Sequence, residues 1–78
     1  MKQFLNELNL SQLAIYKHLK EVTTDDGSNF KENLVEMEED YESVSERISS
    51  IYNSLSDIEK IEVIHFFTKY LMKKNSDK

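Results

Sequence analysis

The sequence offers few side chains that could carry out chemistry. It contains two histidines and no cysteine. Glu62 and His65 have the Glu-x-x-His spacing of one helix of a di-iron site, but such a site needs a second pair and two further inward glutamates. No second pair exists, because the other histidine, His18, has Ile15 at that spacing. We therefore expect no metal, no cofactor and no small-molecule substrate.

Other chemical patterns are incomplete as well. The segment Asp25-Asp26-Gly27-Ser28 has the composition of a calcium loop. Aligning Gly27 with the invariant glycine of such a loop places Val22 at the first ligand position and Asn33 at the bidentate one, where carboxylates are needed. There is no Gly-rich phosphate loop, since the chain has a single glycine, and no cysteine nucleophile. This predicts a protein that is not an enzyme.

Helices must position these side chains. From Phe30 to Ile58 the apolar residues are separated by gaps of four and three in strict alternation, which is a helical stripe. The stripe consists of Phe30, Leu34, Met37, Tyr41, Val44, Ile48, Ile51, Leu55 and Ile58. No segment shows a strand pattern. We predict an all-α fold, a small three-helix bundle or long helical hairpin with an N-terminal helix, which forms a dimer.

Capping signals set the expected boundaries within one domain, 1–78. Asn29 with Glu32, and Ser56 with Glu59, have capping-box spacing. Residues 1–22 form either one helix or a helix broken at Asn9-Leu10-Ser11, with Ser11 as the N-cap. The remaining segments are a loop at 23–29, a long amphipathic helix at 30–54, a C-terminal helix at 57–74 and a tail at 75–78.

Acidic residues dominate the middle of the chain, whose net charge is −5. Glutamates recur every seven residues on the outer face of the predicted 30–54 helix. Such a face is either simply solvated or a surface that mimics nucleic acid or docks a basic partner. The candidate acidic partner surface consists of Glu32, Glu36, Glu39 and Glu46.

The predicted C-terminal helix is apolar around most of its circumference. Its polar residues share one narrow strip: Glu62, His65, Lys69 and Lys73. A helix of this kind must be covered on more than one side. We therefore predict a homodimer or partner interface at Phe66, Phe67, Tyr70 and Leu71. The alternative is that the other helices of the same chain cover these residues and make them core.

Residues 10–20, LSQLAIYKHLK, resemble the turn and recognition helix of bacterial helix-turn-helix regulators. The resemblance implies a preceding helix built on Phe4, Leu5 and Leu8. It also implies DNA contacts from Ser11, Gln12, Tyr16, Lys17 and Lys20. The sequence departs from the pattern at Leu5, where a small residue is usual, and at Asn9, which replaces the turn glycine. The chain is also acidic, whereas DNA-binding domains carry a basic patch.

No apolar run approaches the roughly 20 residues that span a bilayer, and the N-terminus lacks the apolar core of a signal peptide. We expect a cytoplasmic protein without membrane contact. Abundant Lys, Asn and Ile are common in AT-rich bacterial and phage genomes. The predicted function is a protein–protein interaction module that acts as a regulator, adaptor or inhibitor of a macromolecular partner. The alternative is a DNA-binding regulator that uses residues 10–20.

Overall fold

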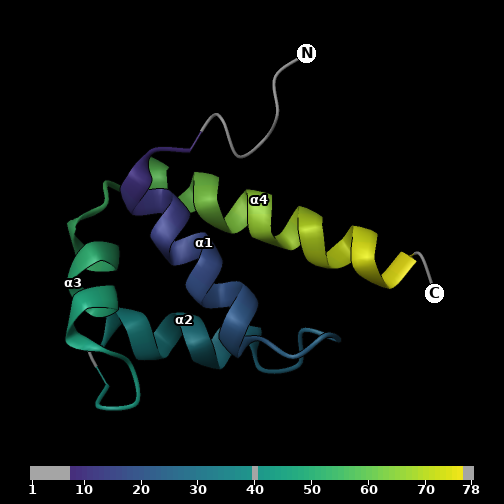
Figure 1. The fold of residues 1–78 in the computed structure, drawn as a ribbon, viewed down its shortest axis with the longest axis horizontal. Coiled ribbons are helices and arrows are strands. Elements are labelled where there is room, and N and C mark those ends of the chain that lie inside the picture. The colour runs from purple at the N-terminus through teal and green to yellow at the C-terminus, as the bar shows by residue number, and fades with distance from the viewer. Residues whose placement is uncertain (1–7, 40, 77–78) are drawn as a thin grey trace.

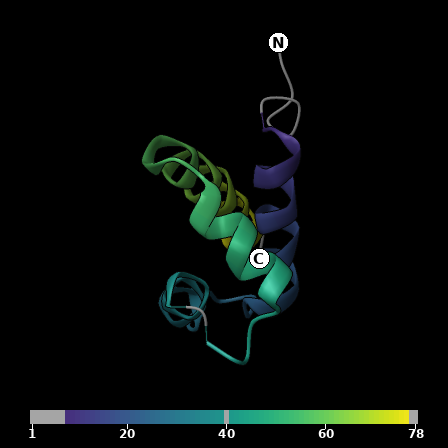
Figure 2. The same cartoon turned by 90° about the vertical axis from the view of Figure 1, so that its left-hand side faces the viewer.

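The computed structural model describes residues 8–39 and 41–76. Its helices are α1 (Leu10–Val22), α2 (Phe30–Glu38), α3 (Glu46–Ser54) and α4 (Asp57–Ser76) (Figure 1). No strand occurs in these two ranges, which confirms the prediction of an all-α fold. In Figure 1, α1 lies between α4 on one side and α2 and α3 on the other. Figure 2 shows α2 nearly end on, with α3 in front of α4. Dimerisation stays a prediction.

The first helix begins after Asn9, which has extended backbone angles and caps it. The Asn9 Oδ1 atom accepts a hydrogen bond from the Gln12 backbone N at 2.8 Å, and the Gln12 Oε1 atom accepts one from the Asn9 backbone N at 3.0 Å. This capping box satisfies two donors at the helix start. α1 starts directly after Asn9, so one helix that continues through residues 8 and 9 is wrong. Ser11 as the N-cap is also wrong, because Ser11 lies inside the first turn. Residues 1–7, with Phe4 and Leu5, lie outside the described residues.

The predicted single helix over 30–54 is wrong, because two helices occupy this range. α2 ends at Glu38, in a last turn that contains no basic residue to offset the helix dipole. α3 starts after Ser45, whose Oγ atom accepts a hydrogen bond from the Ile48 backbone N at 3.2 Å. The 4-3 spacing survives the break because residues on both short helices, such as Met37 and Ile48, face the same core.

Contacts between α2 and α3 replace the continuous helix. The Met37 carbonyl, in the last turn of α2, accepts hydrogen bonds from Ser49 Oγ at 2.9 Å and from Asn53 Nδ2 at 3.0 Å. The carbonyls of a last helical turn have no partner within their own helix. Side chains of α3 therefore provide the donors that the Met37 carbonyl lacks within α2, and these hydrogen bonds hold the two helices together.

The corner between α3 and α4 follows the prediction. The Ser56 Oγ atom accepts a hydrogen bond from the Glu59 backbone N at 3.2 Å, and Glu59 Oε1 accepts one from the Ser56 backbone N at 2.9 Å. This is the predicted capping box, and α4 begins at Asp57 as expected. These hydrogen bonds lower the pKa of Glu59, so the cap stays ionised.

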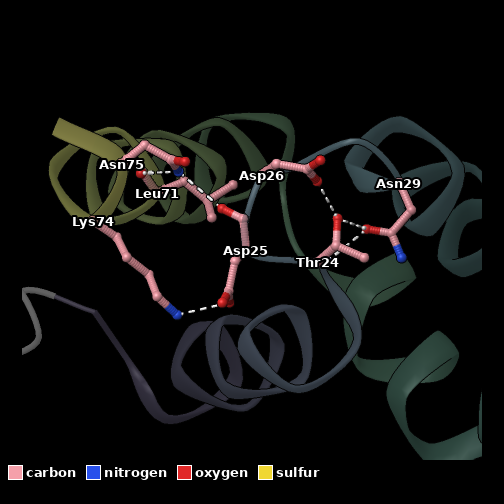
Figure 3. A network of polar contacts seen from close by, with 7 residues as sticks. All are labelled: Thr24, Asp25, Asp26, Asn29, Leu71, Lys74 and Asn75. Atoms are coloured by element: carbon pink, nitrogen blue, oxygen red, sulfur yellow. Dashed lines mark hydrogen bonds and ion pairs between the residues drawn. The ribbon is translucent and has the colours of Figure 1, made fainter. Parts of the chain in front are cut away.

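The loop between α1 and α2 carries a polar network (Figure 3). Gly27 has the predicted positive φ, 74°. The predicted capping box at Asn29 is wrong, because the Asn29 side chain makes no cap bond and its Oδ1 instead accepts from the Thr24 backbone N at 2.9 Å. Asp25 ties the loop to the end of α4, through an ion pair with Lys74 at 2.8 Å and a hydrogen bond from Asn75 to its carbonyl. The 23–29 loop is thereby ordered against α4.

The core lies where α1 crosses α4 and meets α2 and α3. Five of its side chains are completely buried: Ile15, Leu19, Met37, Val63 and Phe67. The Phe67 ring packs against the rings of Tyr16, Phe30 and Tyr70, with centroids 5.4 to 6.2 Å apart. Within the described part of the chain, no buried side-chain nitrogen or oxygen lacks a hydrogen-bond partner. The described interior of one copy is thus packed, and its buried polar side chains have hydrogen-bond partners, without a second copy.

Candidate functional site

An open groove of about 730 Å³ lies between α1 and the start of α3. Its apolar residues are Leu10, Leu13, Ala14, Val22 and Ile48, and its polar residues are Lys17, His18, Glu21, Ser45 and Arg47. One wall follows α1 from its first residue to its last, and the other comes from α3. At about 1.5 Å per residue, the α1 wall is roughly 20 Å long, whereas the facing wall consists of Ser45, Arg47 and Ile48.

Helical periodicity explains why α1 presents this wall. Its buried side carries Gln12, Ile15, Tyr16 and Leu19. The opposite side carries Leu10, Ala14, Lys17 and Glu21, at gaps of four, three and four. Leu10 is 85% exposed at the end of the groove. α1 is thus apolar on its core side and also at several positions of its groove side.

The charge of the groove differs from that of the whole chain. Lys17 on α1 and Arg47 on α3, the single arginine of the sequence, line its two walls, with Glu21 as the one carboxylate among the lining residues. Burial lowers the pKa of His18, against the opposite pull of Glu21 and Glu36, so its ring is neutral at pH 7. The groove is therefore locally cationic on a protein whose net charge is −5.

The four glutamates of the predicted acidic surface do not share one helix face. Glu32 and Glu36 line a smaller hollow of about 290 Å³ on α2, together with the apolar side chains of Val35 and Tyr41. Glu39 is the C-cap of α2, and Glu46 is the first residue of α3. The seven-residue repeat does not place these glutamates on one face, because the predicted helix is broken between Glu38 and Glu46.

The predicted interface on α4 is mostly part of the core. Phe67 is completely buried, and Phe66, Tyr70 and Leu71 are half-buried against it. The apolar side chains that α4 exposes are others: Ile58, Ile61 and Met72, at 61%, 59% and 69% exposure. On the helix these three residues lie beside His65, which belongs to the predicted polar strip. This position is the signal in the sequence that could have identified them as exposed.

The residues of the predicted DNA-binding set point in different directions. Gln12 is 2% exposed, and its Nε2 atom donates to the Glu59 carbonyl at 3.0 Å and to Glu62 Oε1 at 2.9 Å. Tyr16 is buried against α4. Lys17 lines the α1–α3 groove, whereas the Lys20 Nζ atom lies over the ring of Tyr70, 4.9 Å from its centroid.

Ser11 belongs to this set as well, and it is half-buried in the first turn of α1. Leu10 and Ser11 are helical, so the turn that the resemblance requires does not lie at these residues. The five residues therefore do not form one exposed surface.

Residues 8–39 and 41–76 contain no group of three or more His, Cys, Asp or Glu side chains that could hold a metal ion. Within the same ranges no helix is both long and apolar enough to cross a membrane. Comparison with protein-family models, with curated proteins and with solved structures finds no match to this chain.

Proposed function

We propose that the chain is a small protein-interaction module, a regulator, adaptor or inhibitor, whose α1–α3 groove receives one amphipathic helix of a protein partner. The observation that carries this proposal is the groove itself, which has apolar side chains at several positions of α1 and one cationic side chain on each wall. Helices that dock in grooves present apolar side chains at positions i, i+3, i+4 and i+7. The α1 wall, roughly 20 Å long, can lie beside three to four turns of such a helix.

Charge selects the kind of helix. Lys17 and Arg47 stand on opposite walls, so a helix lying between them can place a carboxylate against each. Arginine in particular binds carboxylates through two parallel hydrogen bonds. The proposed occupant is therefore an amphipathic helix with an apolar face flanked by Asp or Glu.

The charge of the remaining surface also favours a protein partner, because it repels nucleic acid. The acidic residues of α2 and α3 lie outside the groove, apart from Glu21 on its α1 wall. They oppose the approach of nucleic acid, which needs a basic patch. A cytoplasmic setting and a bacterial or phage origin belong to this proposal as the context in which the partner is sought.

The test is affinity capture from bacterial lysate with wild type and two matched variants, with and without nuclease. Leu10→Glu places a carboxylate in the groove, whereas Val35→Glu makes the same change at a half-exposed position on α2. We expect a protein that wild type and Val35→Glu retain, that Leu10→Glu loses, and that nuclease does not affect. Capture that is equal for both variants would overturn the groove, and capture abolished by nuclease would favour the DNA-binding alternative.

A further inference from the structure

The outer side of α4 carries an apolar strip that the other described residues of the chain leave exposed. Val63 and Phe67, on the inner side, are completely buried, whereas Ile58, Ile61 and Met72 are each about 60 to 70% exposed. At 100° per residue these three side chains and His65 fall within a sector of about 60°. In Figure 1 the second half of α4 extends past α1, with the loop before α2 as its neighbour.

The strip has the spacing of a helix–helix seam. Its positions 58, 61, 65, 68 and 72 are separated by gaps of three, four, three and four. This heptad spacing keeps side chains on one line when two helices pack at a small angle. From Ile58 to Met72 the seam is about 20 Å long, because each residue adds about 1.5 Å. A single straight helix is therefore the shape that covers it.

We propose that the helix that covers this strip is α4 of a second copy of the chain, packed antiparallel about a twofold axis near His65. In this register Ile58 of one copy lies opposite Met72 of the other, and Ile61 lies beside Thr68 of the other. A twofold contact uses the same patch on both copies, so it needs a patch that is complementary to itself. The strip meets this requirement in its apolar residues and, as follows, in its charges.

The charges of α4 select the antiparallel arrangement. Asp57 lies in its first turn and Lys73 in its last, whereas Glu59 and Lys74 already have partners within one copy, Ser56 and Asp25. An antiparallel pair sets the acidic end of each helix beside the basic end of the other, and it also opposes the two helix dipoles. A parallel pair would bring like charges together. On one flank of the strip, the same register places Glu62 of one copy beside Lys69 of the other.

The size of the strip sets the expected affinity. Three exposed apolar side chains per copy make a contact smaller than a standard protein–protein interface. We expect a dimer with a Kd of roughly 1–100 µM. The strip shares no residue with the α1–α3 groove, so this proposal and the proposed function can fail separately.

Sedimentation of the full chain between about 5 and 500 µM tests the contact. Wild type should dimerise with increasing concentration, and so should the control Val35→Glu. Ile61→Glu should weaken dimerisation by at least about 100-fold, because it buries a carboxylate in the seam. Circular dichroism checks that each variant is folded. Met72→Glu, at the other end of the strip, is the second variant if Ile61→Glu unfolds, and we expect the same loss.

A charge swap tests the antiparallel register. Lys69→Glu should weaken the dimer by about threefold to tenfold, and adding Glu62→Lys should restore it, because the pair re-forms between copies in the opposite sense. Glu62 also accepts a hydrogen bond from Gln12 within one copy, so circular dichroism checks the fold of the double variant. Wild type that is monomeric at about 500 µM would overturn the proposal. So would a dimer that tolerates both Ile61→Glu and Met72→Glu. A folded double variant that dimerises no more strongly than Lys69→Glu alone would overturn the antiparallel register.

Discussion

α1 and α4 pack against each other, and each leaves apolar side chains on its outer side, but the two outer sides differ in shape and charge. The outer side of α1 is one wall of a groove, because α3 rises beside it, and the walls are cationic. The outer side of α4 is a single helix surface whose acidic start and basic end complement each other. This difference in shape and charge is why we propose different occupants for them, a helix of another protein in the first case and a second copy in the second.

The largest effect on stability is expected on the inner side of α4, and the outer side of the same helix provides the comparison. Phe67→Ala should lower the free energy of unfolding by about 3–5 kcal/mol, because it empties a completely buried site. Ile61→Ala, at an exposed position, should change it by no more than about 0.5 kcal/mol. Chemical denaturation at a protein concentration below the dimer Kd measures both. Similar costs for the two variants would mean that the outer side of α4 is also covered within one copy.

The next effect concerns the hydrogen bonds that join α1 to α4. Gln12→Ala should lower the free energy of unfolding by about 1–3 kcal/mol, because it leaves the Glu59 carbonyl without its side-chain donor and removes one of the two hydrogen bonds of the α1 capping box. Gln12→Glu keeps the oxygen that accepts from Asn9 but sets another oxygen against Glu62. It should cost at least as much as Gln12→Ala, measured by the same denaturation curves. A Gln12→Glu variant with the same free energy of unfolding as wild type would show that the α1–α4 contact does not depend on this amide.

The smallest expected effect is the pH dependence of stability that His18, in the groove, contributes. Burial lowers the pKa of His18 in the folded chain below its ordinary 6.5, so the unfolded chain takes up this proton first as the pH falls. The contribution of neutral His18 to stability is complete above pH 6.5 and is lost as the pH falls through the lowered pKa.

Wild type should therefore lose more stability than His18→Gln between about pH 7.5 and pH 5.5. Thermal denaturation of both proteins across this range measures the difference. Because the variant keeps every carboxylate, equal losses would mean that the ring is as well solvated in the folded chain as in the unfolded one.

Local signals predicted some local features correctly, although the capping box at Asn29 and the N-cap at Ser11 are wrong. The capping box at Ser56 and Glu59 lies within four consecutive residues, so the start of α4 followed from the sequence alone. The positive φ at Gly27 was predictable because only glycine adopts it without strain. The break between α2 and α3 was not predictable from spacing, since a 4-3 pattern is the same on one long helix and on two short helices that face one core.

The surfaces were harder to predict because they depend on contacts between distant segments. Phe66 and Phe67 are neighbours of the same type, and the positions of α1 and α2 decide that Phe67 is completely buried and Phe66 is not. The groove joins residues of α1 to Arg47 and Ile48 of α3. A periodic pattern within one helix contains no information about such a pair of walls.

Photo-crosslinking in cells, from a probe residue at one of two positions, tests the difference between the two outer sides most directly. A probe at Leu10 lies in the groove, a probe at Ile61 lies on the α4 strip, and a probe at Val35 is the control. The account predicts that the Leu10 probe joins the 9.2 kDa chain to a different protein and that the Ile61 probe gives a product of twice the chain mass. A Leu10 probe that gives the same products as the Val35 probe would contradict it.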